Sequence, residues 1–317
     1  QKADRRKMNK KTYLIEKAEK GLTIQQYLKQ IAGFSNAQIR SMKFTENGIC
    51  LGGQRARVTT RLSEGDVLEV LLETKNSSSA HLLSFEQMPD ILYEDADVIA
   101  VNKPAGMAVH PSHGHYQDTL ANQLAYYFRK NTQQVEIHSI GGLDLETSGI
   151  VLFAKHRAAA ARLSRQREDG RLQKTYLAIC SGIFAEKNGT LNGAIAPLPG
   201  SLMKMCVSKD GKPAVTHYQV QKQYMEAALV QLTLETGRTH QIRVHMADAG
   251  HPLIGDRLYF ADTDQKADVD AENCFTGIKR AALHASRICF YQPFEGKRIT
   301  VEAPFPEDMK KCLFRDE

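Results

Sequence analysis

The sequence predicts an α+β protein with a mixed, mostly antiparallel sheet and flanking helices, preceded by a small α/β module. Apolar strand patterns cluster after residue 85 without strict alternation with helices, which favours a mixed sheet over a doubly wound one. A serine-rich stretch, Asn76–Ser79, separates two parts of the chain. Residues 1–43 carry 11 Lys and Arg against 3 Asp and Glu, although the net charge of the whole chain is only +6. This imbalance indicates that one module holds an anionic partner, and a solvated basic tail is the alternative.

The pattern divides the chain into four parts. We expect a basic tail over 1–20, a compact module over 21–75, a linker over 76–84 and a larger domain over 85–317. Within the module, apolar residues at helical spacing end at Gly33, and Ser35 is placed to cap a second helix. The basic residues of these two helices are Lys29, Arg40 and Lys43.

In the larger domain, period-2 apolar runs predict strands and amphipathic runs predict helices. The expected strands are Val98–Lys103, Gly149–Lys155, Lys174–Ser181, Ala214–Gln223, Ala228–Glu235, Arg287–Tyr291 and Arg298–Glu302. The expected helices are Thr119–Arg129, Ala158–Arg167 and Thr239–Ala249.

Composition excludes several classes of function. No apolar run reaches the ~20 residues of a membrane span. The six cysteines form no C-x-x-C pair, which argues against zinc and against a secreted disulfide scaffold and favours a reducing cytoplasm. His110, His113 and His115 share a loop, but no cysteine or paired carboxylate joins them, so we expect no metal site. The usual nucleotide-phosphate, nucleophile-elbow and metalloprotease motifs do not occur.

Two segments carry residues suited to chemistry. Asp144 follows the glycine pair Gly141-Gly142 and precedes a buried strand, so it lies in a sharp loop at a sheet end. A turn residue that bonds its own backbone is the alternative for this aspartate. The second segment, 236–246, presents Arg238 and Arg243 near the start of a helix, where arginines can bind carboxylate or phosphate. An amphipathic helix with solvated basic residues is the alternative, and the two histidines of the segment, five residues apart, are poorly spaced for a metal.

At these residues the chain resembles the RluA-type family of pseudouridine synthases. Residues 21–72 resemble an S4 domain, a small RNA-binding module. The remaining similarity is a series of short motifs in the family's order: Tyr93-Glu94-Asp95 through 98–106 with Val109-His110-Pro111; Leu143-Asp144 with Thr147-Ser148-Gly149; Lys174-Thr175-Tyr176; 236–245 with 250–256; and Leu283-His284-Ala285. Each motif is weak alone, but five in order over some 200 residues are specific.

The resemblance implies an enzyme that isomerises uridine in RNA without metal or cofactor. It implies that Asp144 is the nucleophile or base, and that Tyr176 stacks on the target base and can serve a later proton transfer. It also implies that Arg243, or alternatively Arg238, pairs with Asp144 and keeps it ionised. Leu143 and Ile242 would form an apolar wall. The further residues expected to contact substrate are His110, Thr147, Lys174, Arg238, His240 and Gln241. Those expected to bind RNA in the module are Lys29, Arg40 and Lys43.

The resemblance also sets the expected partner and the rival functions. The partner is RNA, by default large-subunit ribosomal RNA, with tRNA as the alternative, and the expected state is a cytoplasmic monomer. One rival is an RNA-binding pseudoenzyme in ribosome assembly. The other is a hydrolase or lyase, which would need a second acid beside Asp144, and Glu146 is the nearest candidate.

One departure from the family pattern affects the expected mechanism. The family's catalytic loop usually reads H-R-L-D, whereas this chain has Gly141-Gly142-Leu143-Asp144. The missing arginine helps to fill the place that a flipped base leaves. We therefore expect either that another residue, His110 or His115, reaches the gap, or that the target uridine is already unstacked.

Overall fold

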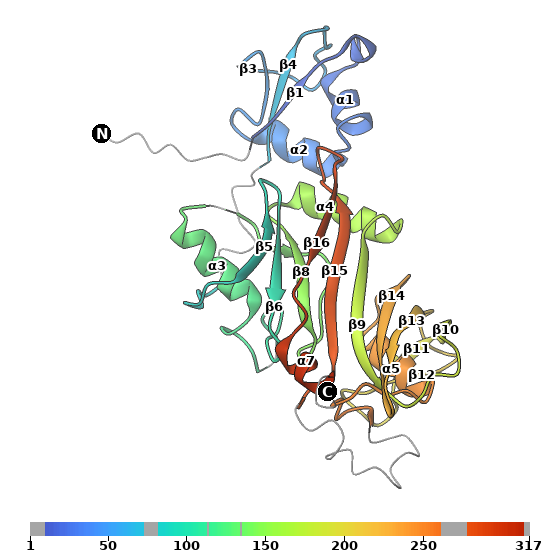
Figure 1. Ribbon diagram of the computed structural model, residues 1–317. Coiled ribbons are helices and arrows are strands. Elements are labelled where there is room, and N and C mark those ends of the chain that lie inside the picture. The colour runs from blue at the N-terminus through green and yellow to red at the C-terminus, as the bar shows by residue number, and fades with distance from the viewer. Residues whose placement is uncertain (1–9, 73–81, 113, 134, 261–277, 314–317) are drawn as a thin grey trace.

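The computed structural model describes residues 10–72, 82–112, 114–133, 135–260 and 278–313. This part of the chain forms a small N-terminal domain and a larger domain built on one long sheet (Figure 1). Most of the expected linker at 76–84 lies outside the described residues, as does Cys274. No helix in the described ranges is long and apolar enough to cross a membrane.

The N-terminal domain is a four-stranded sheet covered by two short helices, consistent with an S4-like domain. Its strands lie in the order β1-β4-β2-β3. The element bounds are β1 Lys10–Leu14, α1 Ile24–Gln30, α2 Asn36–Phe44, β2 Ile49–Leu51, β3 Gln54–Arg55 and β4 Val67–Leu71, with a 3-10 turn at Lys17–Glu19. Thr23 and Ser35 cap the helices by accepting from the backbone N–H groups of Gln26 and Gln38. Such a cap stabilises a helix by about 1 kcal/mol, and the predicted cap at Ser35 is confirmed.

The first domain begins earlier than the sequence predicted. Lys10–Leu14 pairs antiparallel with β4 along its whole length, so residues 10–20 belong to the domain and not to a basic tail. The strand lies at the sheet edge, and its residues alternate only between exposed and half-buried. Because the strand buries no residue fully and begins with two lysines, its period-2 pattern is weak in the sequence.

The larger domain confirms the mixed, mostly antiparallel sheet with helices on it. The strand order is β10-β13-β14-β9-β15-β8-β6-β5, with β16 beside β15 and β7 beside β8. Among the described ladders of this sheet, the pairing of β15 with β8 is parallel and the others are antiparallel. The strand bounds are β5 Asp90–Glu94, β6 Val98–Lys103, β7 His138–Ser139, β8 Ser148–Ala154, β9 Gln173–Ser181, β10 Asn188–Asn192, β13 Val215–Gln223, β14 Ala227–Leu234, β15 Leu283–Tyr291 and β16 Arg298–Glu302.

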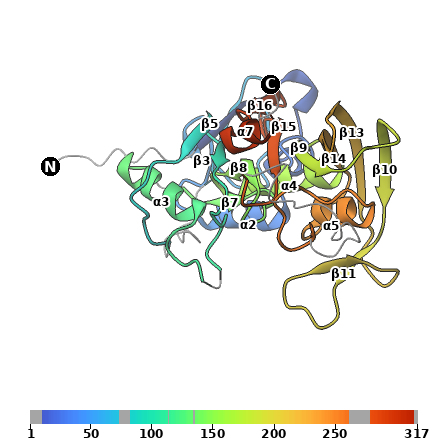
Figure 2. The same ribbon diagram turned by 60° about the horizontal axis from the view of Figure 1, so that its bottom comes forward.

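Helices cover both faces of the sheet. The helix bounds are α3 Leu120–Lys130, α4 Arg157–Glu168, α5 Gln241–Asp248 and α7 Glu307–Leu313. α3 packs its apolar face on alternate residues of β6 and β8, whereas α4 packs on the other alternate residues of the same strands and on β15. A two-stranded ribbon, β11 Ile195–Pro197 with β12 Met205–Val207, stands out from the body beside α5 (Figure 2).

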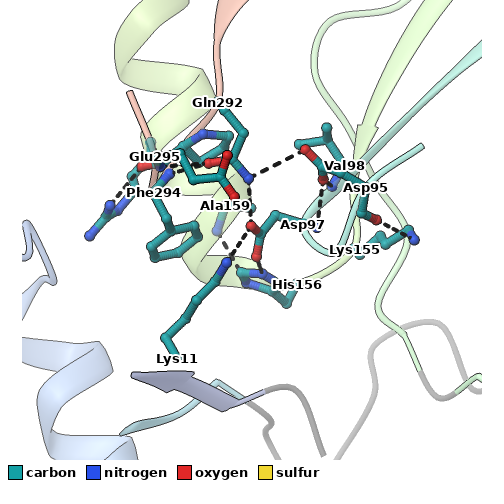
Figure 3. A network of polar contacts seen from close by, with 12 residues as sticks. Lys11, Asp95, Asp97, Val98, Lys155, His156, Ala159, Gln292, Phe294 and Glu295 are labelled. Atoms are coloured by element: carbon teal, nitrogen blue, oxygen red, sulfur yellow. Dashed lines mark hydrogen bonds and ion pairs between the residues drawn. The ribbon is translucent and has the colours of Figure 1, made fainter. Parts of the chain in front are cut away.

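A buried carboxylate joins the two domains. Asp97, fully buried at the start of β6, accepts from Lys11 of β1 at 2.6 Å, from His156 at 2.9 Å and from Gln292 at 2.6 Å (Figure 3). The ammonium of Lys11 also lies 4.6 Å from the ring centre of Phe294. Asp97 thus accepts hydrogen bonds from two residues of the larger domain, His156 and Gln292, and from one residue of the N-terminal domain, Lys11.

An arginine of α4 completes this contact between the domains. The guanidinium of Arg162 lies 5.0 Å from the ring centre of Phe34, on the N-terminal domain, and 4.1 Å from that of Phe294. Its Nη1 donates to the carbonyl of Pro293 at 2.7 Å. Such cation–π contacts are strongest when water is excluded. The N-terminal domain is therefore docked on α4 in one orientation.

We predict that Asp97→Asn weakens folding in a pH-dependent way. Burial alone would raise the pKa of Asp97, but the hydrogen bonds from His156 and Lys11 outweigh it and lower the pKa to about 2. A depressed carboxyl pKa stabilises the folded state by about 2 kcal/mol above pH 4, and this stabilisation disappears as the pH falls toward 2. Urea unfolding should give a lower free energy of unfolding for the variant than for wild type at pH 7. This difference should become smaller below pH 4. Asp210→Asn, at an exposed acid outside the network, is the control. A deficit of the same size at pH 7 and pH 3 would contradict the prediction.

Candidate active site

The loop that carries Asp144 is fixed by the pairing of β8 with β15. Gly149 has φ +106, and a Cβ there would lie 2.3 Å from the carbonyl oxygen of Ala285. Only glycine permits this approach, which allows the two parallel strands to meet. Ser148 and His284 add a side-chain hydrogen bond of 2.9 Å between the same strands. The carbonyl of Asp144 accepts from the N–H of Thr147, so a tight turn leads directly into β8.

A buried lysine holds the same loop from a second side. The ammonium of Lys103, at the end of β6, donates to the carbonyls of Pro104, Met107 and Leu145 at 2.9, 2.7 and 3.1 Å. Burial lowers the pKa of Lys103 to about 7, and the negative charge of Asp144 opposes this shift. Three carbonyl acceptors require three N–H donors, which only the ammonium form supplies. Lys103 therefore ties the loop after β6 to the residue that follows Asp144.

Arg243 on α5 stands between three carboxylates. Its Nε and Nη2 donate to the two carboxylate oxygens of Asp256 at 2.7 and 2.8 Å. Its Nη1 lies 3.7 Å from Oδ2 of Asp144, and its Nη2 lies 4.0 Å from Oε2 of Glu146. The Arg243 and Asp256 side chains are 6% and 0% exposed, whereas that of Asp144 is 26% exposed. The buried pair thus holds the guanidinium in place, and its remaining nitrogen, Nη1, faces the partly exposed carboxylate of Asp144.

Tyr176 of β9 lies beside Asp144 and is kept neutral. Burial, followed by the negative charge of Asp144, raises the pKa of the Tyr176 phenol well above its ordinary value. Leu143 and Ile242 pack in the same apolar cluster as this ring. The structure therefore brings together the expected acid, the expected tyrosine, the expected arginine and both residues of the expected apolar wall.

His240 adjoins the arginine but is held by a protein partner. It caps α5 with φ 55, a left-handed conformation that costs a residue with a side chain about 1 kcal/mol or more. Its Nδ1 lies 2.8 Å from the hydroxyl of Tyr259, and that oxygen accepts from the N–H of Met205 at 2.9 Å. The Tyr259 hydroxyl can then donate its proton to Nδ1 of His240, so a neutral His240 ring carries its own proton on Nε2. Burial lowers the pKa of His240, in agreement with a neutral ring.

Three other expected contact residues turn toward protein groups. The amide of Gln241 donates to Val215 and Thr216 and accepts from Thr236 and from the N–H of residue 238, so it holds the start of α5 instead of facing the loop. Arg238 is exposed and donates to the carbonyl of Pro213. His110 bonds Ser139 at 2.6 Å and packs its ring edge on Phe153. No contact between described residues joins these three side chains to Asp144.

The remaining expected residues fall into two groups. Thr147 is buried in the turn after Asp144, and Lys174 is half-buried two residues before Tyr176 on β9. Lys29, Arg40 and Lys43 are exposed on α1 and α2 of the N-terminal domain. Their exposure suits them for contact with a polyanion.

The glycine pair before Asp144 differs in its two members. Gly141 has φ +76, which favours glycine, whereas Gly142 lies outside the left-handed region. No atom lies within 4 Å of a Cβ placed on Gly142. Neither the backbone conformation nor the space around the Cβ therefore opposes a side chain at Gly142. Of the two histidines expected to reach this gap, His110 bonds Ser139, and His115 bonds Asp118 at 2.7 Å.

The sequence interpretation gave no role to several residues that form the site. Asp256 lies in the motif at 250–256, but its pairing with Arg243, thirteen residues earlier, forms only in the folded chain. Lys103 lies in the motif at 98–106, but its three carbonyl partners cannot be predicted from the sequence. Arg280, which donates to the carbonyls of Glu146 and Leu283 and pairs with Asp308, carries no sequence signal at all.

This arrangement can position a planar ring and attack it. An accessible carboxylate stands at the edge of an apolar wall, a neutral phenol lies beside it, and a fixed guanidinium supplies charge. The second acid, Glu146, accepts from the N–H of Ala281 and so braces the chain. Within the described residues, no group of three or more His, Cys, Asp or Glu side chains could hold a metal ion.

Known proteins share both this sequence and this fold. A family model described as RNA pseudouridylate synthase matches residues 97–248. The uncharacterized RNA pseudouridine synthase YjbO of Bacillus subtilis (strain 168) is 35% identical over 293 residues, which cover 92% of this chain and 98% of that protein. The ribosomal large subunit pseudouridine synthase D of Neisseria meningitidis is 38% identical over 267 residues, which cover 83% and 67%.

Among solved structures, human RNA pseudouridylate synthase domain containing 1 is 27% identical with a TM-score of 0.55, covering 75% of this chain and 90% of that one. Human RNA pseudouridylate synthase domain containing 4, at 24% identity and a TM-score of 0.58, shares the fold. The loop with its aspartate, the motif order and these relatives agree. The chain therefore belongs to the RluA family of RNA pseudouridine synthases and is an isomerase.

Proposed function

We propose that this enzyme isomerises a specific uridine of large-subunit ribosomal RNA, with Asp144 as the catalytic group acting on a flipped base. The observation that carries the proposal is the position of the Asp144 carboxylate, which is accessible, 3.7 Å from a buried guanidinium and next to a neutral tyrosine. The target RNA is supported by relatives named as large-subunit synthases, at 38% and 34% identity.

The reaction is balanced within one nucleotide. The bond between C1′ of the sugar and N1 of uracil breaks, the base rotates, and a bond forms between C1′ and C5. C5 loses its proton and N1 gains one, so no oxidant, reductant or water is consumed. Asp144 serves as the nucleophile or the base in this sequence. Arg243 holds the carboxylate in position and supplies the charge that balances it.

The neutral state of Tyr176 restricts its part in the reaction. A phenol whose pKa lies well above its ordinary value does not act as a base near neutral pH. Its ring, packed with Leu143 and Ile242, instead offers a face on which uracil can stack. Extrusion of a base from a stacked strand costs a few kcal/mol, and this stacking offsets part of that cost.

The decisive experiment maps pseudouridine in a strain that lacks the gene. One pseudouridine or a small set should disappear from large-subunit ribosomal RNA and return with the wild-type gene. Asp144→Asn keeps the shape of the side chain but removes its charge, so it should restore no modification while binding RNA within a few-fold of wild type. Unchanged ribosomal RNA with a lost tRNA pseudouridine would reassign the target. Modification by the Asp144→Asn protein would refute the catalytic assignment.

We predict that Asp256 positions Arg243 for catalysis. Asp256→Asn puts an amide N–H against the guanidinium and removes the charge of the buried pair, so Arg243 loses its fixed orientation. The single-turnover rate at saturating enzyme should fall about 10- to 100-fold, while RNA affinity changes little. Glu146→Gln is the matched control, because Glu146 lies farther from the Arg243 guanidinium, at 4.0 Å. Its single-turnover rate should fall less than that of Asp256→Asn. If both variants lose only affinity, Asp256 has no positioning role.

The open space at Gly142 predicts a preference for unpaired uridines. Without a side chain to fill the gap in a stack, the enzyme should react faster with a uridine in a loop than with the same uridine in a stem. Gly142→Arg meets no atom within 4 Å at its Cβ and should raise the relative rate on the stem. The measurement is the ratio of single-turnover rates on the two RNAs for both proteins. Equal wild-type rates on loop and stem would rule out the preference.

A further inference from the structure

Two cations meet beside the glycine pair that precedes Asp144. A Cβ placed on Gly141 would lie 3.6 Å from Nη1 of Arg167 and 3.8 Å from Nζ of Lys174. Arg167 lies near the end of α4, whereas Lys174 lies on β9. Two separate elements thus bring positive charges within 4 Å of one point, and the glycine leaves that point free of side-chain atoms.

Neither cation is neutralised by the protein. Within the described ranges, Arg167 and Lys174 make no ion pair and no side-chain hydrogen bond. Three of the other arginines around α4 have protein partners: Arg157 pairs with Glu136, Arg162 donates to Pro293, and Arg171 forms a two-point pair with Asp169. The exposed Arg165, like Arg167, has no such partner among the described residues.

The surroundings of Lys174 add to this imbalance. Burial, followed by the positive charge of Arg167, lowers the pKa of Lys174 to about 8. A half-buried lysine that faces an arginine and has no acid nearby is costly for the fold. An anion that binds between the two groups would relieve both the burial and the repulsion.

The two cations lie one step outward from the base pocket. Lys174 and Tyr176 are two residues apart on β9, so their side chains share a face of the sheet and are separated by about 7 Å along the strand. Gly141 precedes Asp144 by three residues on the facing loop. Toward the other side, α4 leads to Arg162 and the contact with the N-terminal domain.

We infer that Arg167 and Lys174 form a subsite for one backbone phosphate of the RNA, adjacent to the nucleotide whose base enters the pocket. This inference rests on the proposed function for the nature of the anion. An arginine fork and a lysine point charge together suit a phosphodiester, whose two free oxygens can each accept a charge-assisted hydrogen bond. The phosphate would be held on the α4 side of the pocket, so the strand leaves the site toward the N-terminal domain.

The first test needs no turnover. Asp144→Asn protein is titrated with an unmodified transcript of large-subunit ribosomal RNA at several salt concentrations, with and without Arg167→Gln. Loss of one phosphate contact should raise Kd about tenfold and reduce the slope of log Kd against log salt by about 1. Arg165→Gln removes the same charge two residues earlier on α4, at an exposed arginine away from Gly141, and should change Kd less than twofold. Equal effects of the two variants would overturn the subsite.

The second test locates the phosphate. Short RNAs that contain the mapped uridine carry a single neutral methylphosphonate at successive linkages. Wild type should lose about tenfold in affinity at one linkage next to the uridine, and Arg167→Gln should lose nothing further at that linkage. Additive losses at every linkage would overturn the inference, even if pseudouridine forms normally. Conversely, if the deletion strain loses no pseudouridine but Arg167→Gln, unlike Arg165→Gln, still weakens RNA binding and reduces the salt slope in the first test, the proposed function fails and the phosphate subsite stands.

Discussion

The buried pair of Arg243 and Asp256 is the constraint on which the site depends. A charged guanidinium that is 6% exposed needs a partner, and a fully buried carboxylate that accepts from two of its nitrogens supplies one. With those nitrogens committed, the third points at Asp144. The pair fixes α5 against the segment after it, and so fixes the direction from which positive charge reaches the loop. Because one partner without the other leaves an unpaired buried charge, a change in either residue alone disturbs the position of the other.

The loop must then be brought to the arginine, and the parallel contact of β8 with β15 achieves this. Gly149 lets the two backbones approach, and the Ser148–His284 hydrogen bond joins them just after Asp144. Lys103 ties the loop to the end of β6 through three carbonyls. Lys103 is 42 residues from its partner Leu145, and His284 is 136 residues from its partner Ser148. The sheet brings these distant parts of the chain to the loop. Loops on such a rigid support are suited to precise chemistry.

Sequence predicts what is periodic or what belongs to a motif. Val98–Lys103 and Arg298–Glu302 were predicted with their observed bounds, because the first begins with a continuous apolar run and the second alternates apolar with polar residues. β1 was missed because a lysine-rich edge strand buries no residue fully. Asp144, Tyr176 and Arg243 were predicted through motifs and do lie together. The roles of Asp256 and Lys103 could not be predicted, because each depends on partners that meet only after folding. Gln241 shows the converse, since its motif position suggested substrate contact while its amide bonds the protein.

One helix connects the docking of the N-terminal domain with the chemistry of the loop. α4 carries Arg162, which lies between Phe34 and Phe294 at the domain contact, and five residues later Arg167, beside Gly141. Five residues of helix span about 7.5 Å, without a joint that could flex. Under the proposed function, RNA bound by the exposed Lys29, Arg40 and Lys43 of α1 and α2 would therefore meet Asp144 in one orientation. The proposed RNA affinity of the small domain would then contribute to orientation at the pocket, because a flexible tether would supply binding without alignment.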